Sequence, residues 1–341
     1  MVELESVKDE SPLSRSLQTE HYNGAVAVVS ADKELAADSQ GFSQIDMKVP
    51  FASHTLSGAG TVTQQFFGVL LMQFVEKGTL KLTDKLSQYV PEYKQADNIT
   101  IGQLATMQSG VPDYLTLMAE PFKKNAPVTL PAERLALQID QHNAAAMDLA
   151  KVLDVVNEQP LDFKPGSQTV YSSTNAILLG EVLDRLTEER PLEAVLKEKI
   201  YDPLALTHTK MGTAHAFAES YHWIAGNPNL AGKGDENQAD RGLVTTVDDL
   251  EKFAQAVLKN QLLQPKSWET IFKAAEAGYG FGWHNLGSGW LGNSGSVLGY
   301  NGLLSINRKQ KKAAVGLTNV LKPQAEMTQF VDKIQKAALE L

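Results

Sequence analysis

The sequence predicts an α+β protein (an α/β sandwich), in which helices flank an antiparallel β-sheet and a mostly α-helical subdomain is inserted. Near the N-terminus, residues 25–29 form a short, apolar and largely β-branched run that is typical of a buried strand. Residues 79–200 have mainly helical patterns. Strand-like segments at 302–307 and 313–319 then form an expected hairpin, and an amphipathic helix begins at Pro323. Strands near both ends of the chain, separated by helices, indicate this architecture.

The pattern of apolar residues predicts the remaining elements in chain order. Residues 62–75 are apolar on nearly every face, which indicates a buried helix, and Gly78 ends it. Further helices are expected at 131–141, 144–158, 175–187, 192–199 and 248–260, and a strand at 279–283. We expect residues 1–20 to be a flexible, charged leader and residues 21–341 to be a single domain. Its sheet parts are expected at about 21–60 and 205–341, and its helical subdomain at about 79–200.

Composition excludes several classes of function. The net charge of −9 and the sequence pI of about 5.3 argue against nucleic acid and anionic lipid as partners. The chain has no cysteine, and its seven histidines lack ligand spacing, so we expect no metal site. Nucleotide-binding glycine motifs are absent from the sequence, and we expect no cofactor. An apolar run long enough for a membrane span or a signal peptide is likewise absent from the sequence.

Thr61 stands at the start of the apolar helix, and Gln64 follows one turn later on the same face. A helix N-terminus favours anionic groups, so this hydroxyl is placed as in an active-site scaffold. The structural alternative is that Thr61 caps the helix. A nucleophile at Ser57 is a weaker alternative, because it has no lysine three residues later.

Several short motifs occur in a familiar order along most of the chain. The segment Gly60-Thr61-Val62-Thr63-Gln64-Gln65-Phe66 is similar to G-S-V-T-K-x-F, Tyr171-Ser172-Ser173 to Y-S-N, and Gly292-Asn293-Ser294-Gly295 to G-H-T-G. Segments 75–82, 99–114, 165–166 and 242–246 match the flanking motifs. From residue 24 to residue 341 the chain thus resembles the serine β-lactamase and penicillin-binding-protein group, in particular its class C-like, esterase-like branch, with degenerate catalytic motifs. The resemblance implies the β-lactamase/transpeptidase-like fold.

The resemblance assigns catalytic positions to Thr61, Gln64 and Tyr171. In the family, a serine attacks a carbonyl group, and a lysine and a tyrosine handle its proton. Thr61 retains a hydroxyl, but its extra methyl group restricts χ1. Gln64 is a neutral amide, which neither accepts a proton nor supplies positive charge. Tyr171 is the intact proton-handling group, and its alternative role is that of an ordinary packed tyrosine.

The resemblance assigns substrate-binding positions to Ser173, Asn293, Ser294 and Gly295. Ser173 is shorter than the family's asparagine, and Asn293 replaces a lysine or histidine. The strand around Gly295 would supply oxyanion donors. Residues 293–295 also fit a plain turn.

Two hypotheses on function follow. In the first, the chain is a catalytically inactive or very weak homologue that binds peptide-like or cell-wall-like ligands or a protein partner. In the second, it is an active acyl-transfer enzyme (an esterase, or D-aminopeptidase-like or DD-peptidase-like) that uses Thr61 with Tyr171, and a lysine such as Lys48 replaces the missing base. Whether the chain is an enzyme stays open at this point. The resemblance suggests the cell surface as its location.

Overall fold

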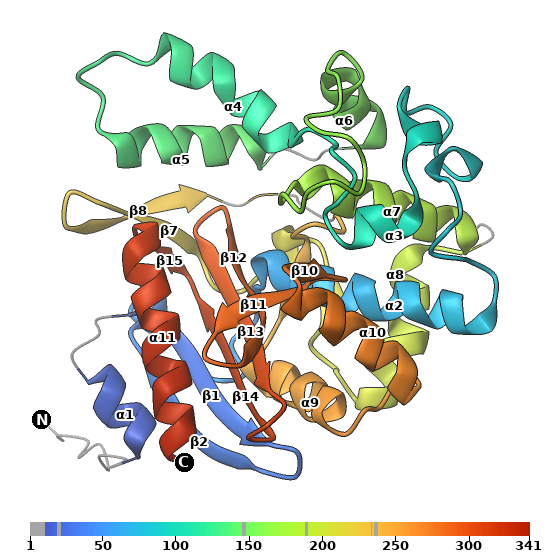
Figure 1. Cartoon of the computed structure of the whole chain (residues 1–341). Helices are drawn as coiled ribbons and strands as arrows, with labels where there is room; N and C mark the ends of the chain where they lie inside the picture. The colour runs from blue at the N-terminus through green and yellow to red at the C-terminus, as the bar shows by residue number, and fades with distance from the viewer. Residues whose placement is uncertain (1–10, 19–21, 145–147, 188–189, 233, 235–237) are drawn as a thin grey trace, which may run out of the picture.

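The computed structural model describes residues 11–18, 22–144, 148–187, 190–232, 234 and 238–341. Its centre is a seven-stranded sheet in which every neighbouring pair is antiparallel (Figure 1). The strand order is β10 (Tyr279–Gly280), β11 (Trp283–Gly287), β12 (Trp290–Val297), β13 (Tyr300–Asn307), β14 (Lys312–Thr318), β1 (Gly24–Ser30) and β2 (Glu34–Gln40). The α+β class and the antiparallel sheet flanked by helices are therefore confirmed.

Strand β1 shows why the apolar run near the N-terminus is continuous rather than alternating. It lies between β14 and β2, and both of its faces are covered. Ala25, Ala27 and Val29 contribute to one hydrophobic core, and Val26 and Val28 contribute to a second core on the other face. A strand that is buried on both sides needs apolar residues at every position. Its pairing with β14 joins a strand from the N-terminal part of the chain to one from the C-terminal part in a single sheet.

Different helices cover the two faces of the sheet. The long C-terminal helix α11 (Gln324–Glu340) and the short α1 (Pro12–Leu17) cover one face, whereas α2 (Thr63–Lys77), α9 (Val247–Leu258) and α10 (Pro265–Glu276) cover the other (Figure 1). The expectation of a flexible leader differs from the structure at α1. Leu13 and Leu17 of this helix are fully buried against α11, because the segment is amphipathic and the side chain of Ser11 caps it.

The described part of residues 79–200 is built from helices, which form a group to one side of the sheet (Figure 1). They are α3 (Ile101–Ala105), α4 (Tyr114–Asn125), α5 (Ala132–Asn143), α6 (Leu149–Val156), α7 (Ser173–Leu186) and α8 (Leu192–Leu196), with single turns at Leu86–Gln88, Ala96–Asn98, Lys197–Tyr201 and Asp202–Leu204. The helix expected at 144–158 begins only at Leu149, and residues 145–147 lie outside the described residues. Helices α4 and α10 were not expected from the sequence.

Small sheets and one further turn complete the fold. They contain β3 (Phe42–Gln44), β4 (Val49–Pro50), β5 (Ser57–Gly58), β6 (Lys210–Met211), β7 (Ser220–Ile224), β8 (Asn227–Gly232), β9 (Leu243–Thr245), β15 (Val320–Leu321) and the turn Thr213–His215. In the described part of the chain, no helix combines the length and the apolar character that crossing a bilayer requires.

Candidate active-site cleft

A cavity of about 690 Å³ opens between β12, the start of α2 and the loop that precedes α7. Its walls contain Thr61, Tyr171, Ser173 and the β12 residues 293–295. Gln64 lies behind this wall and is only 4% exposed. The structure thus brings together residues that are more than 230 positions apart in the chain, since Thr61 and Asn293 are separated by 232 residues.

The start of α2 is packed closely against β12. Thr61 lies in a single 3₁₀ turn (Gly60–Val62), and Gly60 has a positive φ of 53°. A Cβ atom on Gly60 would come within 2.2 Å of the Gly295 carbonyl oxygen, and one on Gly295 would come within 2.2 Å of Thr61 Oγ1. A larger residue at position 60 would therefore meet the backbone of β12, and one at position 295 would meet the Thr61 side chain. This contact fixes the Thr61 hydroxyl beside strand β12.

The Thr61 hydroxyl donates a hydrogen bond of 2.7 Å to Oδ1 of Asn293. Asn293 in turn donates from Nδ2 to the Gly282 carbonyl oxygen at 2.9 Å, which fixes the orientation of its amide. The expected helix cap at Thr61 is wrong, because the Thr61 hydroxyl faces Asn293 and α2 begins at Thr63. The plain turn expected as an alternative at 293–295 is also wrong, because these residues belong to β12 and pair with β13.

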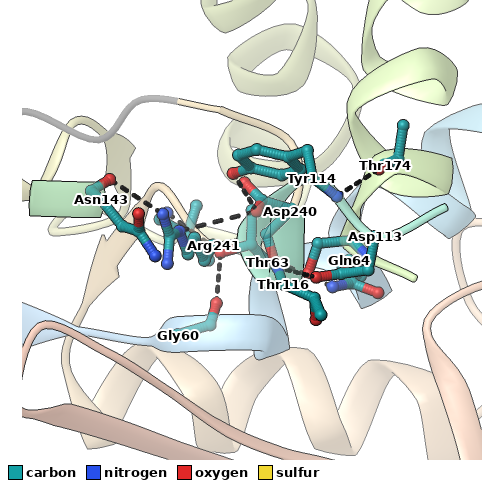
Figure 2. A network of polar contacts seen from close by, with 12 residues as sticks. Gly60, Thr63, Gln64, Asp113, Tyr114, Thr116, Asn143, Thr174, Asp240 and Arg241 are labelled. Carbon is teal, nitrogen blue, oxygen red and sulfur yellow. Dashed lines mark hydrogen bonds and ion pairs between the residues drawn. The ribbon is translucent and has the colours of Figure 1, made fainter. Parts of the chain in front are cut away.

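The Gln64 amide uses both of its ends in hydrogen bonds. Its Nε2 donates to the Tyr171 hydroxyl oxygen at 2.7 Å and to the Asp240 carbonyl oxygen at 3.0 Å. Its Oε1 accepts a hydrogen bond from the Tyr279 hydroxyl. Figure 2 shows Gln64 directed toward Asp240 within a larger polar network. Gln64, which the motif resemblance aligns with the family's lysine, is therefore a buried amide with a complete set of partners.

Tyr171 is 46% exposed at the wall of the cleft, and its ring lies edge-on to that of Tyr279 with centroids 6.0 Å apart. Its hydroxyl end faces inward, toward Gln64 and the hydroxyl of Ser173, which is 3.4 Å away. Burial of this hydroxyl raises the pKa of Tyr171 to about 12, although the hydrogen bonds with Ser173 and Gln64 act in the opposite direction. At neutral pH the phenol is therefore protonated, and it has little capacity to act as a base.

Sequence reasoning missed a buried polar cluster beside Gln64, which Figure 2 shows. Asp240 is 1% exposed and accepts a hydrogen bond of 2.9 Å from the Tyr114 hydroxyl, and Arg241 Nε lies 3.6 Å from the same carboxylate oxygen. Burial raises the pKa of Asp240, although Arg241 and Tyr114 lower it. Arg241 also donates to the Asn143 carbonyl oxygen at 3.1 Å, which ties the end of α5 to the cleft.

Among the described residues that line the cleft, Arg241 is the only arginine or lysine. Lys48, which sequence reasoning considered as a replacement base, lies on the exposed turn between β3 and β4, outside the described lining of the cleft. Ser57 is buried in β5 and is likewise not part of that described lining, so the displaced nucleophile is wrong.

Tyr279 and His284 are the other functional candidates that the sequence did not reveal. Both line the cleft, and their rings stack with centroids 6.1 Å apart. Burial lowers the pKa of His284, so this imidazole is neutral at pH 7. The sequence predicted a strand at Tyr279, but its contact with Gln64 spans 215 positions, and a local pattern cannot reveal such a pair.

The fold and the cleft indicate the class of proteins that contains β-lactamases and penicillin-binding proteins, and six of the seven residues that the motif resemblance singled out line one cavity. The sequence model of the beta-lactamase family matches residues 13–338. The chain therefore belongs to the beta-lactamase family.

Similar proteins agree with this assignment. The chain is 24% identical over 333 residues to protein flp of Staphylococcus aureus (strain NCTC 8325 / PS 47), a match that covers 90% of this chain and 62% of flp. It thus spans about three-fifths of the length of that relative. It is also 26% identical over 286 residues to a beta-lactamase of Escherichia coli (strain K12), with 80% of this chain and 68% of that protein covered.

Solved structures support the fold. EstCE1, described as a hydrolase with promiscuous acyltransferase activity, matches with a TM-score of 0.75 at 20% identity over 96% of each chain. A D-amino acid amidase from Ochrobactrum anthropi SV3 matches with a TM-score of 0.74 at 19% identity, over 96% of this chain and 97% of that one.

Proposed function

We propose that this chain is a catalytically inactive or very weak member of the beta-lactamase family whose cleft binds a peptide-like or cell-wall-like ligand or a protein partner. The observation that carries this proposal is the environment of the Thr61 hydroxyl. Its hydrogen atom is directed to Oδ1 of Asn293, an amide oxygen that is not basic. Acyl transfer requires instead a group that removes this proton as the oxygen attacks.

The groups around Gln64 support the same conclusion. A base at position 64 is absent by residue type, and the loss of a general base typically removes a factor of about 10² to 10⁴ in rate. Tyr171, the remaining candidate, has its pKa raised to about 12 and accepts a hydrogen bond from Gln64. Of the two groups that handle the proton in the family, the lysine is thus replaced by a neutral amide, and the retained tyrosine is a protonated phenol.

The cleft itself supports a binding role. Its volume of about 690 Å³ lies within the range of about 300–1,000 Å³ typical of ligand pockets. Its walls contain residues with hydroxyl and amide side chains, and these are groups that recognise peptide amides and carboxylates. A peptide-like or cell-wall-like ligand contains both.

The alternative is an active enzyme of the esterase, D-aminopeptidase or DD-peptidase type that uses Thr61 with Tyr171. One observation favours it: His284, a neutral imidazole, lines the same cleft as Thr61. The relatives in fold include a D-amino acid amidase and a hydrolase. In this alternative His284, rather than Lys48, would supply the missing base.

The test is intact-protein mass spectrometry after incubation with a fluorophosphonate and, separately, with a labelled penicillin. We expect no adduct in the parent protein, and the Thr61→Ala variant serves as the matched control. A stoichiometric adduct that disappears in Thr61→Ala would overturn the proposal, and its loss in His284→Ala would identify the base.

A second arm shows that the assay can detect acylation on this scaffold. Three oxygen atoms surround the Gln64 amide nitrogen and oxygen: those of the Tyr171 and Tyr279 hydroxyls and the Asp240 carbonyl. A lysine ammonium group can donate to all three. We therefore expect the double variant Thr61→Ser/Gln64→Lys to fold and to form an adduct slowly, while the parent protein does not.

A further inference from the structure

A second cavity, of about 360 Å³, lies between α11, the β7–β8 hairpin and the start of β3, and its described lining shares no residue with the cleft. Figure 1 shows α11 beside β7 and β15. Its volume falls within the range of about 300–1,000 Å³ that is typical of small-molecule sites. Nothing in the proposed chemistry of the cleft uses this place.

Four aromatic residues contribute to the walls of this cavity: Tyr22, Phe42, Trp223 and Phe330. Tyr22 and Phe330 have ring centroids 4.9 Å apart at an angle of 49°, and both side chains are buried. Trp223 of β7 and Phe42 of β3 also line the cavity, and Phe42 is 37% exposed. Flat rings on several sides suit a flat apolar molecule better than a branched aliphatic one.

One part of the lining is charged. Lys322, which follows β15, has its Nζ atom 5.8 Å from the centroid of the Trp223 ring and 3.7 Å from Oε2 of Glu326. The Lys322 side chain is 20% exposed, whereas that of Glu326 is 52% exposed. Because the Glu326 side chain is half-exposed and its carboxylate lies 3.7 Å from the ammonium group, another anion can replace it there at little cost.

A buried hydroxyl lies in the same wall. Thr318 of β14 is 5% exposed, and its Oγ1 has no hydrogen-bond partner among the described residues. A buried hydroxyl without a partner is costly, and a bound molecule with a polar atom would supply one after rotation about χ1.

We propose that this cavity is a second ligand site, which takes a small aromatic carboxylate. The apolar ring system would pack between Trp223 and Phe330, and the carboxylate would bind the Lys322 ammonium group in place of Glu326. A charge-assisted hydrogen bond to a partly buried ammonium group is stronger than one between neutral groups. This assignment does not depend on activity, or its loss, in the cleft.

The test is isothermal titration calorimetry of the full chain with naphthylacetate, and with naphthylacetamide as the uncharged matched probe. We expect naphthylacetate to bind with a dissociation constant at or below about 1 mM and the amide at least about tenfold more weakly. Lys322→Met retains the apolar stem and should weaken the binding of naphthylacetate by about tenfold. Lys322→Arg should retain it, and Glu326→Gln should strengthen it severalfold, because the competing carboxylate is removed.

Two control variants separate this site from other causes. Lys336→Met removes an exposed lysine from α11, the helix that carries Glu326, and should leave the affinity unchanged. Tyr171→Ala alters the cleft and should also leave it unchanged. The proposal is overturned if naphthylacetate does not bind, if acid and amide bind equally, if Lys322→Met or Glu326→Gln shows no effect or the opposite one, or if Tyr171→Ala abolishes binding.

Discussion

Replacing Gln64 by leucine should destabilise the fold, because the Gln64 amide satisfies buried groups from three separate segments of the chain. Without it, the Tyr279 hydroxyl and the Asp240 carbonyl oxygen lose a partner, and both residues are at least 93% buried, with exposures of 7% and 1%. Each buried group left without a partner costs about 1–3 kcal/mol, and the apolar leucine offsets part of this. The Tyr171 hydroxyl also loses its hydrogen bond from Gln64, but it keeps the contact with the Ser173 hydroxyl at 3.4 Å. We therefore expect a loss of about 2–4 kcal/mol in the free energy of unfolding.

This loss converts into a shift in melting temperature. An unfolding entropy of about 2.1 cal/mol/K per residue gives roughly 0.7 kcal/mol/K for 341 residues, so the expected decrease is about 3–6 °C. The assay is differential scanning calorimetry together with urea unfolding.

The neighbouring Gln65→Leu is the matched control. Gln65 is fully buried on the same helix, but it makes one long bond of 3.3 Å to the Leu304 carbonyl oxygen, and its Oε1 has no hydrogen-bond partner among the residues that the structure describes. We expect a change within about 1 kcal/mol for this variant. Equal effects of Gln64→Leu and Gln65→Leu, or a loss below about 1 kcal/mol at Gln64, would refute the structural role of the amide.

Three further predictions concern other groups. Gly295→Ala should lower the free energy of unfolding by about 1–3 kcal/mol, because its Cβ would lie 2.2 Å from Thr61 Oγ1. This loss should be smaller when Thr61 is also replaced by alanine. A double-mutant cycle measured by urea unfolding that shows no coupling between the two positions would contradict this packing. The alkaline difference spectrum between the parent and Tyr171→Phe should show no ionisation of Tyr171 below about pH 10, since its pKa is raised to about 12; a phenolate signal near neutral pH would restore Tyr171 as a base. Burial, with Glu34 and Asp248 nearby, raises the pKa of Glu251 from 4.5 to about 7. The folded state therefore holds this proton more tightly than the unfolded state, so the contribution of Glu251 to stability is complete below pH 4.5 and is lost as the pH rises through about 7. Between pH 4 and pH 8, the free energy of unfolding of Glu251→Gln should rise by about 1 kcal/mol relative to that of the parent, once partial solvent exposure is allowed for. If the free energies of unfolding of the two proteins change in parallel with pH, this effect is excluded.

Local patterns in the sequence predicted those parts of the fold that local interactions determine. The apolar run at 25–29, the hairpin strands at 302–307 and 313–319 and the amphipathic last helix after Pro323 are each recognisable within a short stretch of sequence, and each is confirmed. Helix α10 was missed although Pro265 stands at its first position, and α1 was missed because its buried face has only two leucines. Such weak signals become visible only when the surface that covers them is known.

In the candidate site, too, the sequence predicted the residues involved but not their contacts. The motif order predicted a set of residues for one site, and the structure places Thr61, Tyr171 and Asn293 at one cavity. The partners of those residues were beyond a sequence argument. The Thr61–Asn293 bond and the contact between Gln64 and Tyr279 depend on side-chain orientations and span more than 200 positions, with separations of 232 and 215. Local spacing has no bearing on contacts at such separations.

The hydrogen bonds of Thr61, Gln64 and Asn293 help to explain how the site differs from that of an acyl-transfer enzyme. Substitutions that merely remove catalytic groups from a buried site would leave polar atoms without partners, at about 1–3 kcal/mol each. Here the replacements fit one another: the Thr61 hydroxyl donates to Asn293, Asn293 donates to the Gly282 carbonyl oxygen, and Gln64 bonds at both ends of its amide. A set of compatible changes at separate positions is what selection for a stable, well-ordered cleft would produce. This is why we favour a retained binding function over a site that has only decayed, and why the double variant Thr61→Ser/Gln64→Lys should acylate only slowly: Asn293 would still direct the hydroxyl proton away from the restored lysine.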